Sequence, residues 1–237
     1  GKGLLRHLYL RMGFATGEIM VCPVVAGKGH LPQEQELAVS LAKAFPGVVS
    51  IVINHNPRNT NVILGPKTRL LWGKETIDDI LCGVRVTLSP HSFYQVNRDQ
   101  AQRLYETALD LAQLKGSDIL LDLYCGAGTI GLAAAGRVKQ VYGAEIVPQA
   151  VENAKRNAAQ NQIRNAEFLC ADCSQAVEEF AQRGIRPDVI VVDPPRKGCA
   201  PEVLTAIRDF SPERLVMISC NPATAARDCK ELVKIIV

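Results

Sequence analysis

The chain has 237 residues, of which 27 are Lys or Arg and 24 are Asp or Glu, giving a formal net charge of +3. Hydrophobic residues make up 47% and charged residues 22%, which excludes a disordered chain and is typical of a protein with a substantial core. No apolar run approaches the roughly 20 residues needed to span a bilayer, and residues 1–7 do not form a secretory signal. The weak basic charge is compatible with an RNA partner but does not require one.

Eight cysteines are scattered along the chain. Because a domain of this size needs no disulfide framework, we expect reduced thiols in a cytoplasmic protein. Cys170 and Cys173 form a C-x-x-C pair, but no second pair at zinc-finger spacing exists, so no metal site is predicted.

The first ninety residues predict a small α+β domain. Residues 4–12 and 18–25 are extended and apolar on either side of a glycine-containing turn, which predicts a hairpin. Residues 32–45 have helical spacing, and residues 48–54 alternate as a strand. The expected inner face of that helix consists of Leu37, Leu41, Ala44 and Phe45. Further short strands are expected around Val62, Leu70 and Val84.

A connecting segment, residues 91–115, contains a predicted helix over 97–114. Its expected inward residues are Leu104, Ala108, Leu111 and Ala112. From residue 116 to 237 apolar strands alternate with helices, which predicts a parallel sheet covered on both faces, a doubly wound Rossmann-like α/β domain. The expected strands are 119–123, 140–145, 166–170, 189–193 and 215–219. The expected helices are 130–135, 148–161, 175–182, 201–209 and 224–233. Residues 234–237 look like the start of another buried strand, so the chain is interpreted as a fragment.

The first strand of this domain leads into Tyr124-Cys125-Gly126-Ala127-Gly128-Thr129. Gly126 and Gly128 allow the backbone to approach a ligand and turn into a helix. The second strand ends at Glu145, whose carboxylate can accept hydrogen bonds from both hydroxyls of a ribose. Asp172 follows the third strand, where it can meet an adenine edge. The pattern favours S-adenosylmethionine as the ligand; because Gly126 to Gly131 also matches G-x-G-x-x-G, an NAD enzyme is the alternative.

The fourth and fifth strands carry the expected chemistry. Asp193-Pro194-Pro195-Arg196 follows the fourth strand, with Arg196 where methyltransferases acting on exocyclic amines often have an aromatic residue. Arg196 and Lys197 suit RNA phosphates. Cys220, at the tip of the fifth strand, is a candidate nucleophile: a thiolate that adds to carbon 6 of uracil makes carbon 5 able to attack a methyl donor.

These motifs resemble those of the RNA uracil-5-methyltransferase family, most closely its bacterial members that act on 23S rRNA. The matching stretches are residues 5–7, 16–20, 92–97, 121–129, 144–147, 193–198 and 219–224. The resemblance implies that Gln95, Tyr124, Glu145 and Asp193 bind the donor or line the base pocket, with Asp193 also meeting a flipped uracil. It implies substrate contacts by Phe93 and Arg196 and a nucleophilic role for Cys220. Thr129 stands where some members have Asn.

The family usually begins with a β-barrel RNA-binding domain, often followed by an iron–sulfur cluster, and the matching residues are not found here. Its general base is a glutamate after the last helix, beyond residue 237, so the resemblance implies impaired turnover. The alternatives are a tRNA uracil-5-methyltransferase, a cytosine-5 RNA methyltransferase and a non-catalytic RNA-binding module. The cytosine enzyme is disfavoured because Pro195 is followed by Arg196 rather than cysteine. No protein or membrane partner is predicted.

Overall fold

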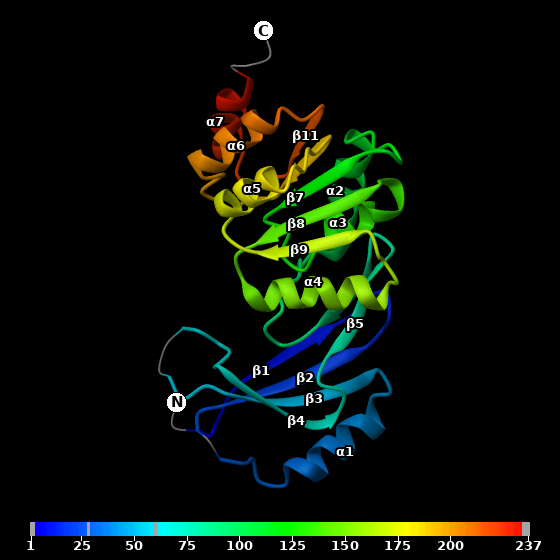
Figure 1. Cartoon of the computed structure of the whole chain (residues 1–237). Coiled ribbons are helices and arrows are strands. Elements are labelled where there is room, and N and C mark those ends of the chain that lie inside the picture. Colours follow the sequence, from blue (N-terminus) through cyan, green and yellow to red (C-terminus); the bar gives the residue numbers. More distant parts are fainter. Residues whose placement is uncertain (1–2, 28, 59–60, 234–237) are drawn as a thin grey trace. The chain divides into compact units, whose positions relative to one another are not determined.

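A computed structural model describes residues 3–27, 29–58 and 61–233 and divides the chain into two compact units (Figure 1). Unit 1 comprises residues 1–81 and 85–94, and unit 2 comprises residues 82–84 and 95–237. The predicted strand that begins at residue 234 lies outside the described residues. None of the helices in the described ranges is long and apolar enough to cross a membrane.

Unit 1 is built on a four-stranded sheet with the order β1-β2-β3-β4. The strands are β1 (Leu5–Met12), β2 (Ile19–Val25), β3 (Val48–His55) and β4 (Lys67–Gly73). β1 and β2 form the predicted antiparallel hairpin, and β3 and β4 are also antiparallel. β2 and β3 are parallel, so helix α1 (Glu34–Ala44) serves as their crossover.

In unit 1, one predicted strand is absent from the described residues, one strand was not predicted, and the inner face of a helix was partly misplaced. No strand forms around Val62, whereas a strand that was not predicted, β5 (Ile77–Leu81), pairs with β6 (Val84–Leu88). The face of α1 was also misplaced, because Leu37 and Phe45 are exposed while Ala38 is fully buried. Ala38 packs with Val21, Val48 and Ile51. The small alanine lets the helix lie close to the sheet; of the residues predicted to face inward, Leu41 packs against this cluster, whereas Ala44 is exposed.

Unit 2 is the predicted parallel sheet, with the strand order β11-β10-β7-β8-β9. Its strands are β7 (Ile119–Leu123), β8 (Gln140–Glu145), β9 (Ala166–Cys170), β10 (Val189–Val192) and β11 (Arg214–Met217). Its helices are α2 (Arg98–Leu111), α3 (Thr129–Ala134), α4 (Pro148–Gln160), α5 (Cys173–Gln182), α6 (Pro201–Phe210) and α7 (Pro222–Val233). The order reverses at β7, which makes the carboxyl ends of β7 and its neighbours the place where such sheets bind ligands.

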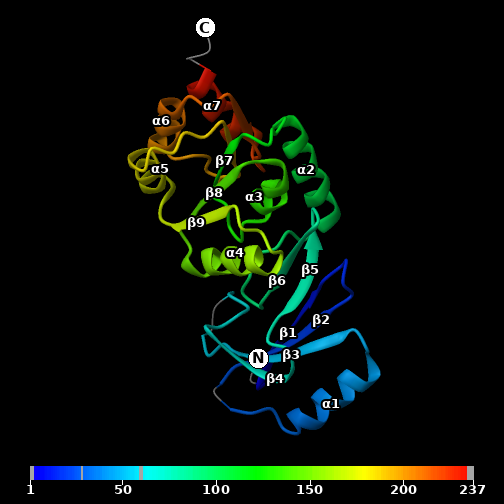
Figure 2. The same ribbon diagram turned by 45° about the vertical axis from the view of Figure 1, so that its right-hand side comes forward.

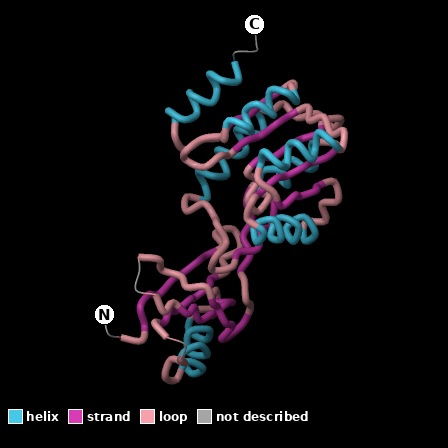
Figure 3. Tube along the Cα trace, turned by 60° about the vertical axis from the view of Figure 1, so that its left-hand side comes forward, coloured by secondary structure: helices cyan, strands magenta, loops and turns pink. Residues whose placement is uncertain are grey.

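Helices cover both faces of this sheet, as Figures 2 and 3 show. On one face, side chains from β7 and β10 pack against α5 and α6 around the fully buried Phe180. Helices α2, α3 and α4 lie on the other face. The inner side of α2 differs from the prediction: Leu104 and Leu111 are exposed, and Tyr105 and Leu109 are buried with the correctly predicted Ala108 and Ala112. The strands are apolar in nearly every position because both faces are covered.

Candidate active site at the carboxyl ends of the unit 2 strands

The turn after β7 has an unusual backbone. Tyr124, Gly126 and Gly128 all have left-handed conformations, with φ values of 62°, 54° and 77°. A side chain at Gly128 would lie 2.9 Å from two ring carbons of Phe168 and 3.0 Å from Cβ of Ala154, so close packing on β9 and α4 requires glycine there. A Cβ at Gly126 would meet no atom within 4 Å. The backbone at Gly126 is therefore open to the close approach of a ligand.

Glu145, the last residue of β8, lies beside this turn. Its carboxylate accepts a hydrogen bond from the Gly126 amide at 3.1 Å and, through its other oxygen, from the Val147 amide at 2.9 Å. A carboxylate has about four acceptor positions, so two remain after these bonds. The structure thus brings Glu145 and Gly126 together, and leaves the carboxylate able to accept from a pair of hydroxyl groups.

Two further carboxyl groups lie at the same edge of the sheet. Asp193 directly follows β10, and partial burial raises its pKa to about 6. Asp122, in β7, is fully buried; its Oδ2 accepts from the Gly131 amide at 2.9 Å, whereas Oδ1 has no hydrogen-bond partner among the described residues. Burial, and to a lesser extent the charges of Asp193 and Glu145, raises the pKa of Asp122 to about 7.

The sequence analysis missed Asp122. The available signal was an acidic residue inside the apolar strand 119–123, since a buried carboxyl group is rarely tolerated without a role. Its bond to the Gly131 amide joins β7 to the first turn of α3, which begins at Thr129. Asp122 therefore fixes the helix that follows the glycine turn.

We expect the stability of the protein to depend on Asp122 between pH 5 and pH 8. The folded pKa, about 7, lies above the unfolded value, near 4. Stability due to this group is therefore present below pH 4 and is lost as the pH rises toward 7. In Asp122→Asn the decrease in unfolding free energy from pH 5 to pH 8 should be smaller by on the order of 2 kcal/mol.

Urea unfolding at four pH values, followed by circular dichroism, measures this effect. The exposed Asp209 on α6 provides the control, because Asp209→Asn should leave the wild-type pH profile unchanged. Parallel profiles for Asp122→Asn and the wild type would contradict the assignment.

Gln95 and Tyr124 are held by contacts within unit 2. The Gln95 side-chain amide donates to the hydroxyl of Tyr105 at 3.3 Å. Tyr105 is buried on α2, and its pKa is raised to about 12 by desolvation first and by the charges of Asp193 and Asp122 next. The Tyr124 hydroxyl accepts from the Ala200 amide at 3.4 Å, and the ring packs against the α5–α6 side of the sheet. Gln95 is thus linked through Tyr105 to the surroundings of Asp193.

Asp172 lies near Tyr124, whose pKa is raised by burial first and also by the charge of Asp172. Asp172 caps α5 by accepting from the amide and hydroxyl of Ser174, at 2.9 and 2.6 Å, and these bonds lower its pKa. One carboxylate oxygen takes both bonds, which leaves the other oxygen for an additional donor. Phe93 belongs to unit 1 and is 81% exposed.

Cys220 occupies the turn between β11 and α7, and its side chain is exposed. The turn is held by Ser219, whose hydroxyl accepts from the Asn221 amide at 3.1 Å, and by the Asn221 side chain, which accepts from the Ala223 amide. Cys22, Cys125, Cys173 and Cys199 are buried, and burial raises the pKa of each thiol. Cys220 therefore combines exposure with a position at the ligand-binding edge of the sheet.

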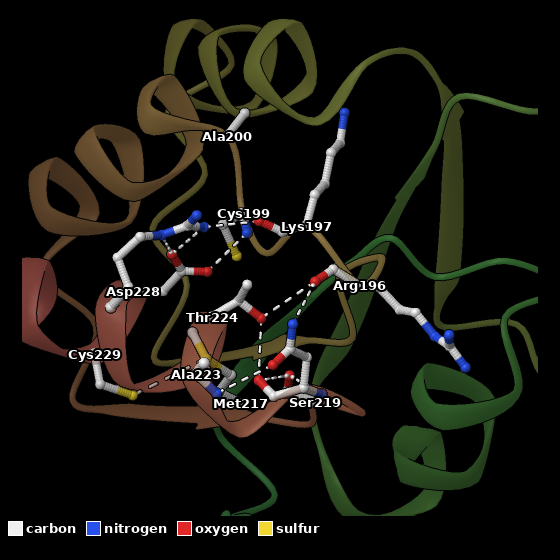
Figure 4. A network of polar contacts seen from close by, with 12 residues as sticks. Arg196, Lys197, Cys199, Ala200, Met217, Ser219, Ala223, Thr224, Asp228 and Cys229 are labelled. Carbon is white, nitrogen blue, oxygen red and sulfur yellow. Dashed lines mark hydrogen bonds and ion pairs between the residues drawn. The ribbon is translucent and has the colours of Figure 1, made fainter.

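The loop that contains Arg196 is tied to the turn that contains Cys220. The Asn221 side-chain amide and the Thr224 hydroxyl both donate to the carbonyl of Arg196, at 3.2 and 3.3 Å (Figure 4). The Arg196 side chain is exposed and extends away from these contacts. Among the described residues, no three His, Cys, Asp or Glu side chains are grouped to hold a metal ion.

Comparison with known proteins gives the family. A family profile described as "tRNA (Uracil-5-)-methyltransferase" matches residues 66–236. The chain belongs to this family. Within it, the chain is 48% identical over 231 residues to an uncharacterized RNA methyltransferase of Halalkalibacterium halodurans and 45% identical over 227 residues to one of Clostridium tetani. The alignments cover 98% and 96% of this chain but 50% and 49% of the relatives, so the chain spans about half the length of these family members.

Solved structures agree with the assignment of the chain to this family. The tRNA (uracil-54, C5)-methyltransferase of Pyrococcus abyssi, solved with S-adenosyl-L-homocysteine, is 34% identical with a TM-score of 0.81, and the match covers 98% of this chain and 54% of that one. A SAM-dependent methyltransferase from Agrobacterium tumefaciens is 18% identical with a TM-score of 0.60, covering 98% and 79%, and supports the fold alone. The predicted Rossmann-like methyltransferase fold is thereby confirmed.

Proposed function

We propose that this uracil-5-methyltransferase family member binds S-adenosylmethionine and transfers its methyl group to carbon 5 of a uridine in RNA, with Cys220 as the nucleophile. The observation that carries the proposal is the position of Cys220: an exposed thiol at a turn hydrogen-bonded to the loop that begins at Asp193. Exposure is what a nucleophile requires, and the buried cysteines of unit 2 lack it.

The residues beyond the ends of β7, β8 and β10 fit the donor. The open backbone at Gly126 allows close approach, and the unused acceptor positions of Glu145 suit two ribose hydroxyls. The carboxyl groups of Glu145 and Asp193 lie close enough to Asp122 that, in addition to burial, their charges raise its pKa. Such a concentration of acidic groups favours a ligand with a positive sulfonium and ammonium group. We propose that Tyr124, Gly128 and Thr129 shape this donor site and that Asp172 meets the adenine with its second oxygen.

When bound, the donor supplies an electrophilic methyl group. The Cys220 thiolate forms a bond from sulfur to carbon 6 of the uracil, which moves electron density to carbon 5, and carbon 5 then takes the methyl group. Loss of the carbon 5 proton to a base and cleavage of the sulfur–carbon 6 bond restore the ring and the thiolate. Asp193 and Gln95 are proposed to hydrogen-bond the uracil or the donor, and Phe93 and Arg196 to contact the RNA.

We propose 23S rRNA as the substrate, because the motifs resemble those of family members that act on it. The alternative substrate is tRNA, and the likeness to the Pyrococcus enzyme supports this alternative. RNA is methylated inside cells before it is used, so we expect a cytoplasmic location. The first 94 residues contain ten Lys or Arg against six Asp or Glu, so their net charge is +4. This positive charge favours contact of unit 1 with RNA phosphates.

Nucleoside analysis tests the proposal. The protein is incubated with methyl-labelled S-adenosylmethionine and either a 23S rRNA fragment or unmodified tRNA, and the digested RNA is examined by mass spectrometry. We expect labelled 5-methyluridine, in larger yield from rRNA. Labelled 5-methylcytidine would overturn the choice of base, and a larger yield from tRNA would overturn the choice of RNA. Bound donor with neither a labelled nucleoside nor a covalent protein–RNA adduct would favour the non-catalytic alternative.

A further inference from the structure

Asn221 and the first turns of α7 hydrogen-bond the backbone of the loop 195–199 at four points (Figure 4), and the Cys199 thiol also interacts with Asp228. The carbonyl of Arg196 accepts from Asn221 and Thr224, as described above, and the carbonyl of Lys197 accepts from Arg227 at 2.8 Å. The Cys199 amide donates to Asp228 at 2.8 Å. We name these four α7-side residues, Asn221, Thr224, Arg227 and Asp228, the loop clamp.

Asp228 is the centre of the clamp. Its carboxylate is fully buried, and its Oδ1 accepts from Nε and Nη2 of Arg227 at 2.8 and 2.7 Å. Its Oδ2 accepts from the Cys199 amide. A buried carboxylate is tolerated only when it is paired and hydrogen-bonded, and here both of its oxygens are used. Asp228 therefore bonds the loop directly at Cys199 and holds Arg227, which in turn donates to the Lys197 carbonyl.

The loop has the backbone shape that the clamp requires. Gly198 has a left-handed conformation, with φ at 84°, and its amide donates to the Pro195 carbonyl at 2.8 Å. A side chain at Gly198 would lie 2.3 Å from Nη2 of Arg227 and 2.5 Å from Oδ2 of Asp228. The glycine lets the clamp reach the loop backbone. The side chains of Arg196 and Lys197 extend away from α7.

Cys220 directly precedes Asn221, the first residue of the clamp. We propose that the loop clamp is a positioning device: it fixes the loop that carries Asp193 and Arg196 relative to Cys220, so that the thiol and the base-contacting groups keep one geometry. The clamp residues do not touch the reacting atoms. This inference rests on the proposed function. Because displacement of a reacting group by about 1 Å reduces rates by about a hundredfold, a loosened loop should slow thiol addition more than donor binding.

The test compares Asp228→Ala and Thr224→Val with the unaltered protein. Thr224→Ser, which keeps the hydroxyl, is the matched control for Thr224→Val, and Lys230→Ala is the control for an exposed residue of the same helix. Three quantities are measured: hydrogen exchange of residues 196–199, the rate of covalent adduct formation with RNA containing 5-fluorouridine, and the dissociation constant of S-adenosylhomocysteine. Thermal unfolding identifies variants that do not fold.

We expect exchange of the Cys199 amide to rise by about tenfold or more in Asp228→Ala, because its acceptor is removed. Adduct formation should slow by about 10- to 100-fold in Asp228→Ala and by about threefold to tenfold in Thr224→Val, while the dissociation constant changes by less than about threefold. Thr224→Ser and Lys230→Ala should match the unaltered protein. If Asp228→Ala does not fold, Thr224→Val and Thr224→Ser decide the matter.

Faster exchange with an unchanged adduct rate would overturn the positioning role, and so would unchanged exchange. An equal loss of donor affinity and adduct rate would mean that the clamp only stabilises the fold, which also overturns it. Failure of the proposed function is seen separately: the unaltered protein would then form no adduct, while the exchange measurement still decides whether the clamp holds the loop.

Discussion

Replacing Cys220 with alanine is expected to abolish covalent attachment to RNA that contains 5-fluorouridine and to reduce methyl transfer by about 10⁴-fold or more, because the thiolate that activates carbon 5 is lost. Fluorine at carbon 5 cannot leave as a proton does, so the bond between Cys220 sulfur and carbon 6 persists after methylation. A denaturing gel then shows protein and RNA as one slower band, which depends on S-adenosylmethionine.

The chain provides matched controls for this experiment. Cys170 and Cys229 are also exposed, so Cys170→Ala and Cys229→Ala test whether any accessible thiol can react. Both variants should form the adduct at the wild-type rate. An adduct that survives in Cys220→Ala but disappears in one of the controls would transfer the nucleophilic role to another cysteine. The surface position of Cys220 also means that its replacement should leave the unfolding temperature nearly unchanged.

Gly128→Ala is expected to destabilise unit 2 by about 3 kcal/mol. Alanine at a φ of 77° costs about 1–2 kcal/mol, and forcing its Cβ against Phe168 and Ala154 costs about 1–3 kcal/mol. The unfolding temperature should fall by about 6–12 °C, since a change of 1 kcal/mol corresponds to about 2–4 °C in chains of this size. Differential scanning calorimetry measures the shift.

Gly126→Ala separates packing from ligand binding in the same turn. Its φ of 54° carries a similar backbone cost, but the added Cβ meets no atom within 4 Å. We therefore expect a stability loss of only about 1 kcal/mol, together with a decrease in donor affinity of about tenfold or more, because the methyl group occupies the open side of the turn. Equal destabilisation by the two substitutions would contradict the packing explanation. Unchanged donor affinity in Gly126→Ala would show that the donor does not approach there.

The elements of unit 2 were predicted well because a sheet that is covered on both faces requires strands that are apolar along their whole length, and such strands are easily recognised in a sequence. Strands such as Val189–Val192 are buried at every position, so they appear as uninterrupted apolar runs. The prolines at positions 148 and 201 begin α4 and α6, where a missing amide hydrogen is harmless. Because apolar runs define the strands and prolines define the starts of α4 and α6, the ends of these strands and helices were predicted to within a few residues.

The predictions that failed concern side chains whose surroundings are set by distant residues. The burial of Glu34 in α1 was not predicted: its carboxylate pairs with His30 nearby and with Arg69, 35 residues away, and helical spacing contains no information about the second contact. β5 was missed because Asp78 and Asp79 interrupt its apolar pattern. Asp79 is fully buried there and accepts from the Ala15 amide and the Tyr94 hydroxyl. Periodicity predicts an apolar face, but it cannot find a buried charge that is satisfied from elsewhere in the chain.

For the candidate site, the sequence located the residues at strand ends but not the contacts that hold them. Glu145, Asp193 and Cys220 were predicted as site residues because polar residues that follow buried strands of a parallel sheet collect at one edge, and the structure places all three there. The link from Gln95 to Tyr105 was not predicted. The bonds from Asp228 and Arg227 to the loop were also missed, since they involve the amide of Cys199 and the carbonyl of Lys197, and these backbone groups leave no pattern in the side chains of the sequence.

Because the loop clamp binds mainly backbone atoms, the conformation of the loop does not depend on which side chains the loop presents at its surface. Positions 196 and 197 contribute carbonyl groups to the clamp, which every amino acid possesses, while their side chains extend elsewhere. A protein built in this way can exchange the side chains at these two positions during evolution and acquire a different RNA preference without rebuilding its reaction centre. Position 198 lacks that freedom, because any side chain there would collide with the clamp. Divergence among enzymes that share this arrangement should therefore accumulate beside a fixed glycine.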